Sequence, residues 1–247
     1  MNKPHIHLPV AILAGGLATR LRPVSETIPK ALVPVAGKPF VDHQLALLAS
    51  QGVKRVVFGL GHLGEMVEAH LGREAWGMEI GYCYDGPKLL GTAGALRRAV
   101  PQLGERFFVL YGDSYLPVDY SAVEARFLAC GKLGLMTVFR NEGRWDTSNV
   151  EFANGRVLAY DKSRRTLAMH HIDYGLCVFR MEAFAGTSET EASDLASVMQ
   201  GLLAKGEMAA YEVGERFYEV GTFSGIEELE GYLLRTARAE GAFPSEE

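Results

Sequence analysis

Short apolar runs alternate with amphipathic segments along most of the chain. The apolar runs predict strands at Val10–Ala14, Val53–Leu60, Met78–Tyr84, Phe107–Tyr111, Leu133–Phe139, Arg156–Tyr160, Ile172–Phe179 and Arg216–Val220. The amphipathic segments predict helices at Pro39–Ser50, His62–Leu71, Thr92–Val100, Tyr120–Ala129, Ser193–Ala204 and Ser224–Ala239. Strands that alternate with helices are typical of βα units arranged around a largely parallel sheet. The pattern therefore predicts an α/β protein.

The middle of the chain departs from this alternation. From Leu133 to Phe179 the helices thin out and strands follow one another, which predicts an antiparallel insertion that broadens the sheet and carries a second half-site. The chain has no evident linker, internal repeat or low-complexity tract, apart from a loose tail at 241–247. We therefore expect one domain over residues 1–247, with a mostly parallel mixed sheet.

Composition narrows the classes of function. The 247 residues carry 25 Lys and Arg against 30 Asp and Glu, a net charge of −5, with no basic cluster longer than a pair, so no nucleic-acid partner is expected. No apolar run approaches the roughly 18 residues of a membrane span. The three cysteines are widely separated and lack a C-x-x-C spacing, which disfavours disulfides and zinc and favours a reducing, cytoplasmic compartment.

The densest candidate site follows the first predicted strand. Residues 13–23 read Leu-Ala-Gly-Gly-Leu-Ala-Thr-Arg-Leu-Arg-Pro, and Pro29-Lys30 follows them. Paired glycines let the backbone approach a ligand and aim several N–H groups at one anion, while Arg20 and Lys30 add fixed positive charge. The string therefore predicts a polyphosphate cradle, and its first residues are Leu13, Ala14, Gly15 and Gly16.

A second glycine string, residues 59–64, reads Gly-Leu-Gly-His-Leu-Gly and matches the dinucleotide fingerprint, with Asp85 at the end of the next strand. A nicotinamide site is one interpretation. The predicted helix that follows is short, however, and Glu65 would put negative charge where a pyrophosphate should lie. We favour the other interpretation, a tight strand-to-helix turn.

A third string, Leu-Gly-Thr-Ala-Gly-Ala-Leu at residues 90–96, places small residues at the start of a helix. A base or ribose could lie flat against the backbone at Gly91 and Thr92 and use its N–H groups. The alternative is close packing of this helix against a neighbouring element.

Acidic residues follow two predicted strands. Asp113, in Tyr-Gly-Asp, should emerge at the carboxyl end of a central strand, where a carboxylate close to a phosphate loop can bind Mg²⁺. Glu219 offers a second acidic ligand near the C-terminus. The alternatives are an Asp that caps the next turn and an ordinary strand end.

The middle section supplies polar groups that could hold a sugar and its phosphate. Lys162 follows one predicted strand, and Asp173 and Gly175 lie in the next. Exposed strand ends are the alternative. Trp145 could stack on a ligand, although we favour an anchored loop.

Taken in order from Ala11 to about Leu234, these motifs resemble the sugar-1-phosphate nucleotidyltransferase family, closest in look to mannose- and heptose-1-phosphate guanylyltransferases. The resemblance implies a single-domain, Rossmann-like fold that takes an NTP and a sugar 1-phosphate and releases pyrophosphate with the help of Mg²⁺. It implies nucleotide contacts at Leu13, Ala14, Gly15, Gly16, Arg20, Gly91 and Thr92, and catalytic roles for Arg20, Lys30 and Asp113. It further implies sugar-phosphate contacts at Lys162, Asp173 and Gly175, and metal binding at Asp113 and Glu219.

Two departures keep alternatives open. The family usually has Gly where this chain has Ala18, and Asp where it has Glu219, so a catalytically impaired nucleotide-sugar binding protein is one alternative. The resemblance of the motifs favours GTP, with uridylyl or thymidylyl transfer second. A nicotinamide oxidoreductase and a transferase acting on a non-sugar phosphate such as phosphocholine are further alternatives. Self-association into a homo-oligomer is left open.

Overall fold

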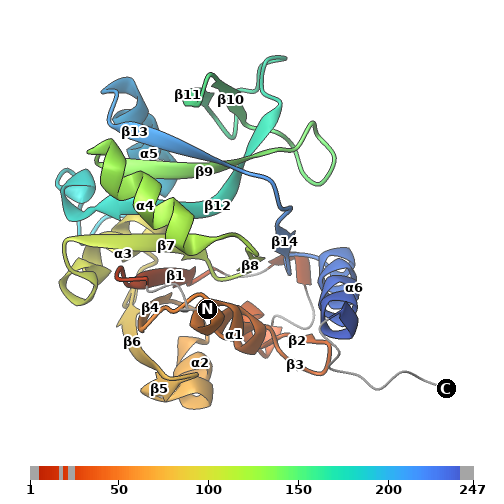
Figure 1. The fold of residues 1–247 in the computed structure, drawn as a ribbon. Coiled ribbons are helices and arrows are strands. Elements are labelled where there is room, and N and C mark those ends of the chain that lie inside the picture. The colour runs from red at the N-terminus through yellow and green to blue at the C-terminus, as the bar shows by residue number, and fades with distance from the viewer. Residues whose placement is uncertain (1–5, 17–18, 22–25, 240–247) are drawn as a thin grey trace.

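Figure 1 shows the computed structural model, which describes residues 6–16, 19–21 and 26–239. Ala18, one of the two departures from the family pattern, lies outside these residues, as do Arg22 and Pro23. The strands are β1 (Val10–Ala14), β2 (Pro34–Val35), β3 (Lys38–Pro39), β4 (Arg55–Leu60), β5 (Glu74–Ala75), β6 (Met78–Tyr84), β7 (Arg106–Tyr111), β8 (Ser114–Tyr115), β9 (Gly134–Arg140), β10 (Val150–Ala153), β11 (Arg156–Tyr160), β12 (His171–Arg180), β13 (Met208–Val213) and β14 (Tyr218–Glu219). The helices are α1 (Phe40–Ser50), α2 (Gly64–Leu71), α3 (Gly91–Leu103), α4 (Tyr120–Cys130), α5 (Leu195–Ala204) and α6 (Phe223–Ala239), with 3-10 turns η1 (Thr19–Leu21), η3 (Lys30–Leu32) and η4 (Met181–Phe184).

Within the described residues, ten strands form one mixed sheet. Its order is β11-β10-β12-β7-β1-β4-β6-β5, with β9 beside β12 and β13 beside β9. Strands β6, β4, β1 and β7 are parallel, whereas β12 runs antiparallel to both β7 and β9. The mostly parallel mixed α/β sheet with an antiparallel insertion is therefore confirmed.

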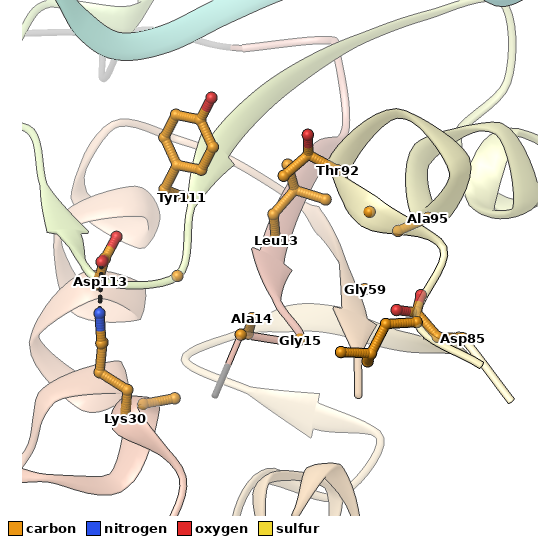
Figure 2. Close-up of a pocket in the computed structure, with 15 residues that line it drawn as sticks. Leu13, Ala14, Gly15, Lys30, Gly59, Asp85, Thr92, Ala95, Tyr111 and Asp113 are labelled. Carbon is orange, nitrogen blue, oxygen red and sulfur yellow. Dashed lines mark hydrogen bonds and ion pairs between the residues drawn. The ribbon is translucent and has the colours of Figure 1, made fainter. Parts of the chain in front are cut away.

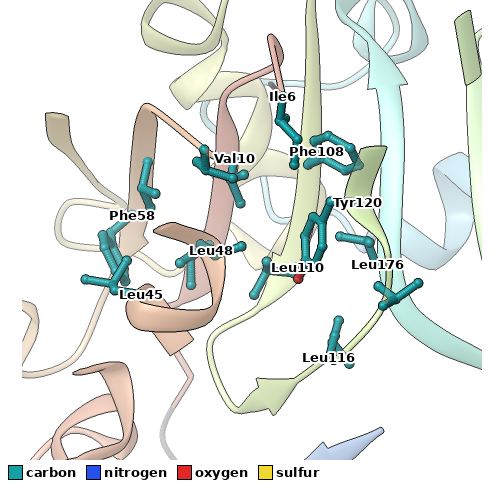
Figure 3. Packing of buried hydrophobic residues seen from close by; sticks show 14 of the residues in the cluster. Ile6, Val10, Leu45, Leu48, Phe58, Phe108, Leu110, Leu116, Tyr120 and Leu176 are labelled. Carbon is teal, nitrogen blue, oxygen red and sulfur yellow. The ribbon is translucent and has the colours of Figure 1, made fainter. Parts of the chain in front are cut away.

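Helices cover both faces of this sheet, so its central strands are apolar on both sides. Figure 3 shows one face, where Leu45 of α1 lies beside Phe58 of β4, and Tyr120 of α4 lies beside Phe108 and Leu110 of β7. Helices α3 and α5 bury their apolar residues against the other face. Successive residues of a strand point to opposite faces, and the unbroken apolar sequence of β1 supplies both cores.

The site lies where the order of the strands reverses. From β1 the chain moves outward through β4 and β6 on one side, and then returns through α3 to place β7 on the other side. Loops that leave the carboxyl ends of β1 and its neighbours must therefore diverge, which opens a crevice. None of the helices in the described residues is long and apolar enough to cross a membrane.

The strand predicted at Arg216–Val220 is longer than the strand in the structure, β14. Only Tyr218 and Glu219 are paired, and they pair antiparallel with β8 in a separate two-stranded sheet. The partner β8 itself has two residues, which limits the length of the ladder. Strands β10 and β13 were not predicted, and β13 extends the sheet parallel to β9.

Candidate active site

A cavity of about 280 Å³ lies at the carboxyl edge of the sheet, beside the end of β1 (Figure 2). Its walls come from the carboxyl ends of β1, β4 and β7 and from the residues that follow β1, β6 and β7. The 3-10 turn η3 and the first two turns of α3 complete them. The predicted site residues that line it are Leu13, Ala14, Gly15, Gly16, Lys30, Gly91, Thr92 and Asp113. The two loops that the sequence linked to phosphate and to base or ribose thus meet in one cavity.

Close backbone approaches hold the turns of this cavity together. A Cβ atom added to Gly112 would lie 2.9 Å from the carbonyl oxygen of Leu13, so only glycine lets the β7 turn reach the end of β1. A Cβ atom added to Gly61 would lie 2.7 Å from the carbonyl oxygen of Gly15. The second glycine string is therefore the turn from β4 to α2, and it packs directly behind the predicted phosphate loop.

Two cations and a carboxylate converge at one end of the cavity. The Nζ atom of Lys30 lies 2.7 Å from Oδ2 of Asp113, which follows β7 as predicted. Arg20 reaches the same place: a Cβ atom on Gly221 would lie 3.1 Å from its Nη2 atom and 3.9 Å from Nζ of Lys30. A polyphosphate placed here would meet two fixed positive charges.

Glu219 completes this group. Strand β14 aligns it with Ser114, and the N–H of Val220 donates to the carbonyl oxygen of Asp113 over 2.9 Å. Burial, and after it the charges of Asp113 and Asp146, raise the pKa of Glu219 to about 7, although Arg20 and Lys30 act in the opposite direction. The carboxylates of Asp113 and Glu219 thus repel each other where Glu219 is largely shielded from water.

That repulsion is what a bound divalent cation would relieve. No group of three His, Cys, Asp or Glu residues in the described part of the chain is arranged to hold a metal on its own. Mg²⁺ usually takes only one or two protein carboxylates and completes its shell with water and substrate phosphate oxygens. Asp113 and Glu219 fit that requirement.

The first turn of α3 has two tasks. Gly91 has φ +68°, and a Cβ atom on it would lie 2.5 Å from the carbonyl oxygen of Ser193. The hydroxyl of Thr92 donates to Oδ1 of Asp194 and accepts the N–H of Leu195, which ties α3 to the start of α5. The side chain of Thr92 therefore serves the packing of α3 against a neighbouring element, although Gly91 and Thr92 both line the cavity. A contact of Thr92 with a base stays a prediction.

The predicted sugar residues gather beside Tyr111, which lines the cavity, although none of the three is among the lining residues. Strand β12 has a register shift between Asp173 and Cys177, and inside it Gly175 has φ +96°, a conformation that favours glycine. A Cβ atom on Gly175 would lie 3.8 Å from the Tyr111 ring. Lys162 places its Nζ atom 5.3 Å from the centre of the same ring.

Asp173 is held inside this bulge. Its Oδ1 atom accepts the N–H of Gly175 over 3.1 Å, and its Oδ2 atom accepts the hydroxyl of Tyr160 over 3.3 Å. Burial raises its pKa, and the charge of Lys162 works in the opposite direction. The structure thus brings all three predicted sugar residues together around Tyr111, for which no role was predicted.

Asp85 lines the cavity, although the favoured interpretation of the second glycine string assigned it no role. It is buried, and Figure 2 shows it on the opposite side of Ala14 and Gly15 from the Lys30–Asp113 pair. Its Oδ2 atom accepts the N–H of Leu90 over 3.3 Å, and burial raises its pKa. Its position directly after strand β6, at the ligand edge of the sheet, was the available signal.

Fold and site together define a class: a nucleotide-binding α/β protein that brings cations, carboxylates and backbone N–H groups to one crevice of an open sheet. The family model described as Nucleotidyl transferase matches residues 10–235, and the chain therefore belongs to this family.

The relatives make the family assignment finer. An N-acetylmuramate alpha-1-phosphate uridylyltransferase from Neisseria meningitidis is 27% identical, over 89% of this chain and 95% of the relative. A D-glycero-alpha-D-manno-heptose 1-phosphate guanylyltransferase from Campylobacter jejuni is 32% identical over 46% of this chain and 51% of its own. A mannose-1-phosphate guanyltransferase beta-B from Xenopus laevis is 25% identical over 85% and 60%. The chain thus matches nearly the whole of the first relative and about half of the other two. The predicted family of sugar-1-phosphate nucleotidyltransferases is confirmed.

Solved structures share the fold. HddC from Yersinia pseudotuberculosis complexed with GMP-PN has a TM-score of 0.75 at 21% identity, with 92% of this chain and 99% of that chain covered. The inositol-1-phosphate CTP transferase from T. maritima has a TM-score of 0.72 at 23% identity, with 90% and 94% covered. At these identities the likeness establishes the fold alone.

Proposed function

We propose that the protein transfers a nucleotidyl group from an NTP, with GTP preferred, to a sugar 1-phosphate, giving a nucleotide sugar and pyrophosphate. The observation that carries this proposal is the convergence of Arg20, Lys30, Asp113 and Glu219, because Lys30 and Asp113 of this group line a glycine-walled cavity. The names of the relatives support the same class. A cytoplasmic setting is part of the proposal, and the three free cysteines support it.

The chemistry follows from the charges. A phosphate oxygen of the sugar phosphate attacks the α-phosphorus of the NTP in line, and the bond from that phosphorus to the pyrophosphate oxygen breaks. Lys30 and Arg20 lie where they would neutralise the transferring group and the departing pyrophosphate. No general base is needed because the nucleophile is already an anion.

Asp113 and Glu219 are the residues that would hold Mg²⁺. When bound, Mg²⁺ supplies positive charge to the phosphate oxygens and orients them. Lys30 also has a positioning task, since its ion pair with Asp113 fixes that carboxylate at the end of the cavity. Lys162 would meet the acceptor phosphate, while Asp173 and Gly175 would contact sugar hydroxyls.

Asp85 supports guanine as the base. Guanine presents two adjacent donors, N1–H and the N2 amino group, which match the two oxygens of a carboxylate. Uracil and thymine present a single N–H between two carbonyl oxygens, and those oxygens would repel Asp85. Asp85 is buried and lines the cavity, and among the residues that the structure describes only its Oδ2 atom has a hydrogen-bond partner. Its Oδ1 atom could make such a contact with guanine.

Uridylyl transfer is the second candidate. It is favoured by the relative from Neisseria meningitidis, which matches this chain over nearly its whole length and is named a uridylyltransferase.

The test is a pyrophosphate-release screen of ATP, GTP, CTP, UTP and dTTP against a panel of sugar 1-phosphates and phosphocholine. We expect turnover with GTP and a hexose or heptose 1-phosphate, and a loss of at least a hundredfold in Asp113→Asn, since removal of one charge-stabilising group typically costs about 10²–10³ in rate. Turnover with UTP but not GTP would establish the second candidate. NTP binding without pyrophosphate release would favour the impaired binding protein.

A separate variant tests whether Asp85 recognises guanine. Asp85→Asn keeps the shape but replaces one acceptor with a donor, so kcat/KM for GTP should fall about ten- to a hundredfold, the size of one bidentate base contact. The relative rate with UTP should rise. Glu79→Gln is the matched control because Glu79 lies on the same strand β6, is exposed and forms an ion pair with Arg55, away from the cavity lining. An unchanged preference in Asp85→Asn would remove Asp85 from base recognition.

A further inference from the structure

The loop between β9 and β10, residues 141–149, is held in shape by one buried side chain. Asn141 is fully buried, and its Nδ2 atom donates to the carbonyl oxygen of Asp146 over 2.5 Å and to Oγ of Ser148 over 3.2 Å. Its Oδ1 atom accepts the N–H of Trp145 over 3.2 Å. The tip of the loop, Trp145 and Asp146, is thereby fixed relative to its base.

Arg216 joins this tip to strand β14. The centre of its guanidinium group lies 3.5 Å from the centre of the Trp145 ring and 4.4 Å from the centre of the Tyr218 ring. The Tyr218 ring in turn lies 4.6 Å from the ring of Tyr232 on α6. The side chain of Arg216 therefore lies between two aromatic rings that come from distant parts of the chain.

The Nε and Nη2 groups of Arg216 are engaged within the protein. Its Nη2 atom lies 2.6 Å from Oε2 of Glu228 on α6, and its Nε atom donates to the carbonyl oxygen of Phe217 over 3.2 Å. An arginine that bound substrate phosphate would present a free planar edge. This arginine is instead suited to connecting elements.

The connected residues are neighbours of acidic groups. Tyr218 precedes Glu219, and Trp145 precedes Asp146, whose charge acts on Glu219. Cation–π contacts contribute from about 0.5 kcal/mol when exposed to about 2 kcal/mol when desolvated, so two of them on one guanidinium can hold a loop in place.

Resting on the proposed function, we propose that Arg216 is a positioning residue for the reaction. By standing between Trp145 and Tyr218 it clamps loop 141–149 to β14, and so fixes Glu219 and Asp146 relative to Asp113. The clamp acts through these acidic residues and has no contact of its own with substrate.

The first test is metal affinity, which does not depend on turnover. We would measure the binding of Mn²⁺ in the presence of a non-hydrolysable NTP by the electron paramagnetic resonance of free Mn²⁺. Arg216→Ala should weaken Mn²⁺ about tenfold and leave the affinity for the nucleotide alone within twofold. Arg216→Lys should do the same, because an ammonium keeps the charge but not the planar contacts. Arg144→Ala is the matched control, since Arg144 lies in the same loop, is exposed and forms an ion pair with Glu142 of that loop.

The second test measures the contact between Arg216 and Trp145 by fluorescence. The chain has two tryptophans, so Trp76→Phe leaves Trp145 as the only indole. In that background Arg216→Ala should shift the emission to longer wavelength and increase acrylamide quenching, whereas Arg144→Ala should change neither. Thermal unfolding of each variant identifies loss of the fold, and Arg216→Lys replaces Arg216→Ala if the latter does not fold.

The outcomes separate the two proposals. If the emission shifts in Arg216→Ala while Mn²⁺ affinity stays that of the unmodified protein, the clamp is structural only and the inference is wrong. If the emission does not respond, the stack itself is wrong. If the unmodified protein releases no pyrophosphate with any pair of substrates, the proposed function fails, and Mn²⁺ affinity still decides the role of Arg216.

Discussion

The carboxylate of Glu219, which would serve metal binding, lowers the stability of the folded protein when no metal is bound. Its carboxyl group has a pKa of about 7, raised from 4.5 mainly by burial and then by the charges of Asp113 and Asp146. Between these two values the folded protein holds a proton that the unfolded chain has released. Stability therefore falls as the pH rises from about 4.5 to 7, because the charged form is costly in the fold.

Replacing this acid should accordingly stabilise the protein without metal. In buffer free of divalent cations at pH 8, Glu219→Gln should unfold at a higher temperature than the unmodified protein. Its free energy of unfolding should be larger by on the order of 1–2 kcal/mol. At pH 4.5 and below the difference should vanish, because both side chains are then neutral. Thermal unfolding across pH measures this. A destabilised Glu219→Gln at pH 8 would mean that Arg20 and Lys30 outweigh the burial of the carboxylate.

At this scale the sequence could predict residues that directly follow a strand of the parallel sheet. Asp113 and the glycines after β1 are such residues, because carboxyl ends of parallel strands meet at one edge. Asp146 could not be found in this way. It lies in a loop between strands of the antiparallel insertion, and its closeness to Glu219 depends on tertiary contacts such as that of Trp145 with Arg216.

Among the elements, the turn from β4 to α2 supports the predicted phosphate loop directly. A Cβ atom on Gly61 would lie 2.7 Å from the carbonyl oxygen of Gly15 and 3.1 Å from Cδ2 of Leu89, both residues of the cavity wall. Gly61→Ala must therefore displace the phosphate loop. We expect a roughly tenfold weaker affinity for NTP, since a displacement of about 1 Å in a binding site can cost up to a hundredfold. Isothermal titration calorimetry with each NTP measures this.

A second glycine provides the control for this variant. A Cβ atom on Gly214 has no neighbour within 4 Å, so Gly214→Ala tests the loss of a glycine without a displaced loop. Its NTP affinity should equal that of the unmodified protein. Equal affinities in both variants would show that Gly61 only shapes its own turn, and that the phosphate loop tolerates the added methyl group.

The elements that sequence could predict are those with a strong apolar signature. Strands β1, β6 and β11 have the predicted bounds, and the helices differ by a few residues at their ends. Strand β13 was missed because Met-Ala-Ala-Tyr-Glu-Val is only half buried and gains its strand conformation by pairing with β9. The strand predicted at Arg216–Val220 was too long for a related reason, since the partner decides where a ladder ends.

At the scale of the whole molecule, strand β12 joins the two halves of the site. One edge of β12 pairs with β7, which leads to Asp113, and the other pairs with β9 of the antiparallel insertion. The buried cluster on the α1 and α4 face crosses the same boundary, because it includes Leu110 of β7, Ile172 of β12 and Leu135 of β9. Neither half can separate without breaking a ladder and exposing a shared core.

We therefore predict that the chain unfolds as one domain in a single transition. In scanning calorimetry the measured enthalpy should equal the van't Hoff enthalpy, the test of a two-state transition. Saturating Mg²⁺ and the preferred NTP should move this whole transition upward, since a ligand at a hundred times its Kd stabilises the folded state by about 2.7 kcal/mol. If two transitions appear and only one of them shifts, the insertion that carries Lys162 and Asp173 unfolds independently, and the single-domain prediction is wrong. A single shifted transition would instead mean that nucleotide bound beside β1 stabilises the sugar half through the continuous sheet.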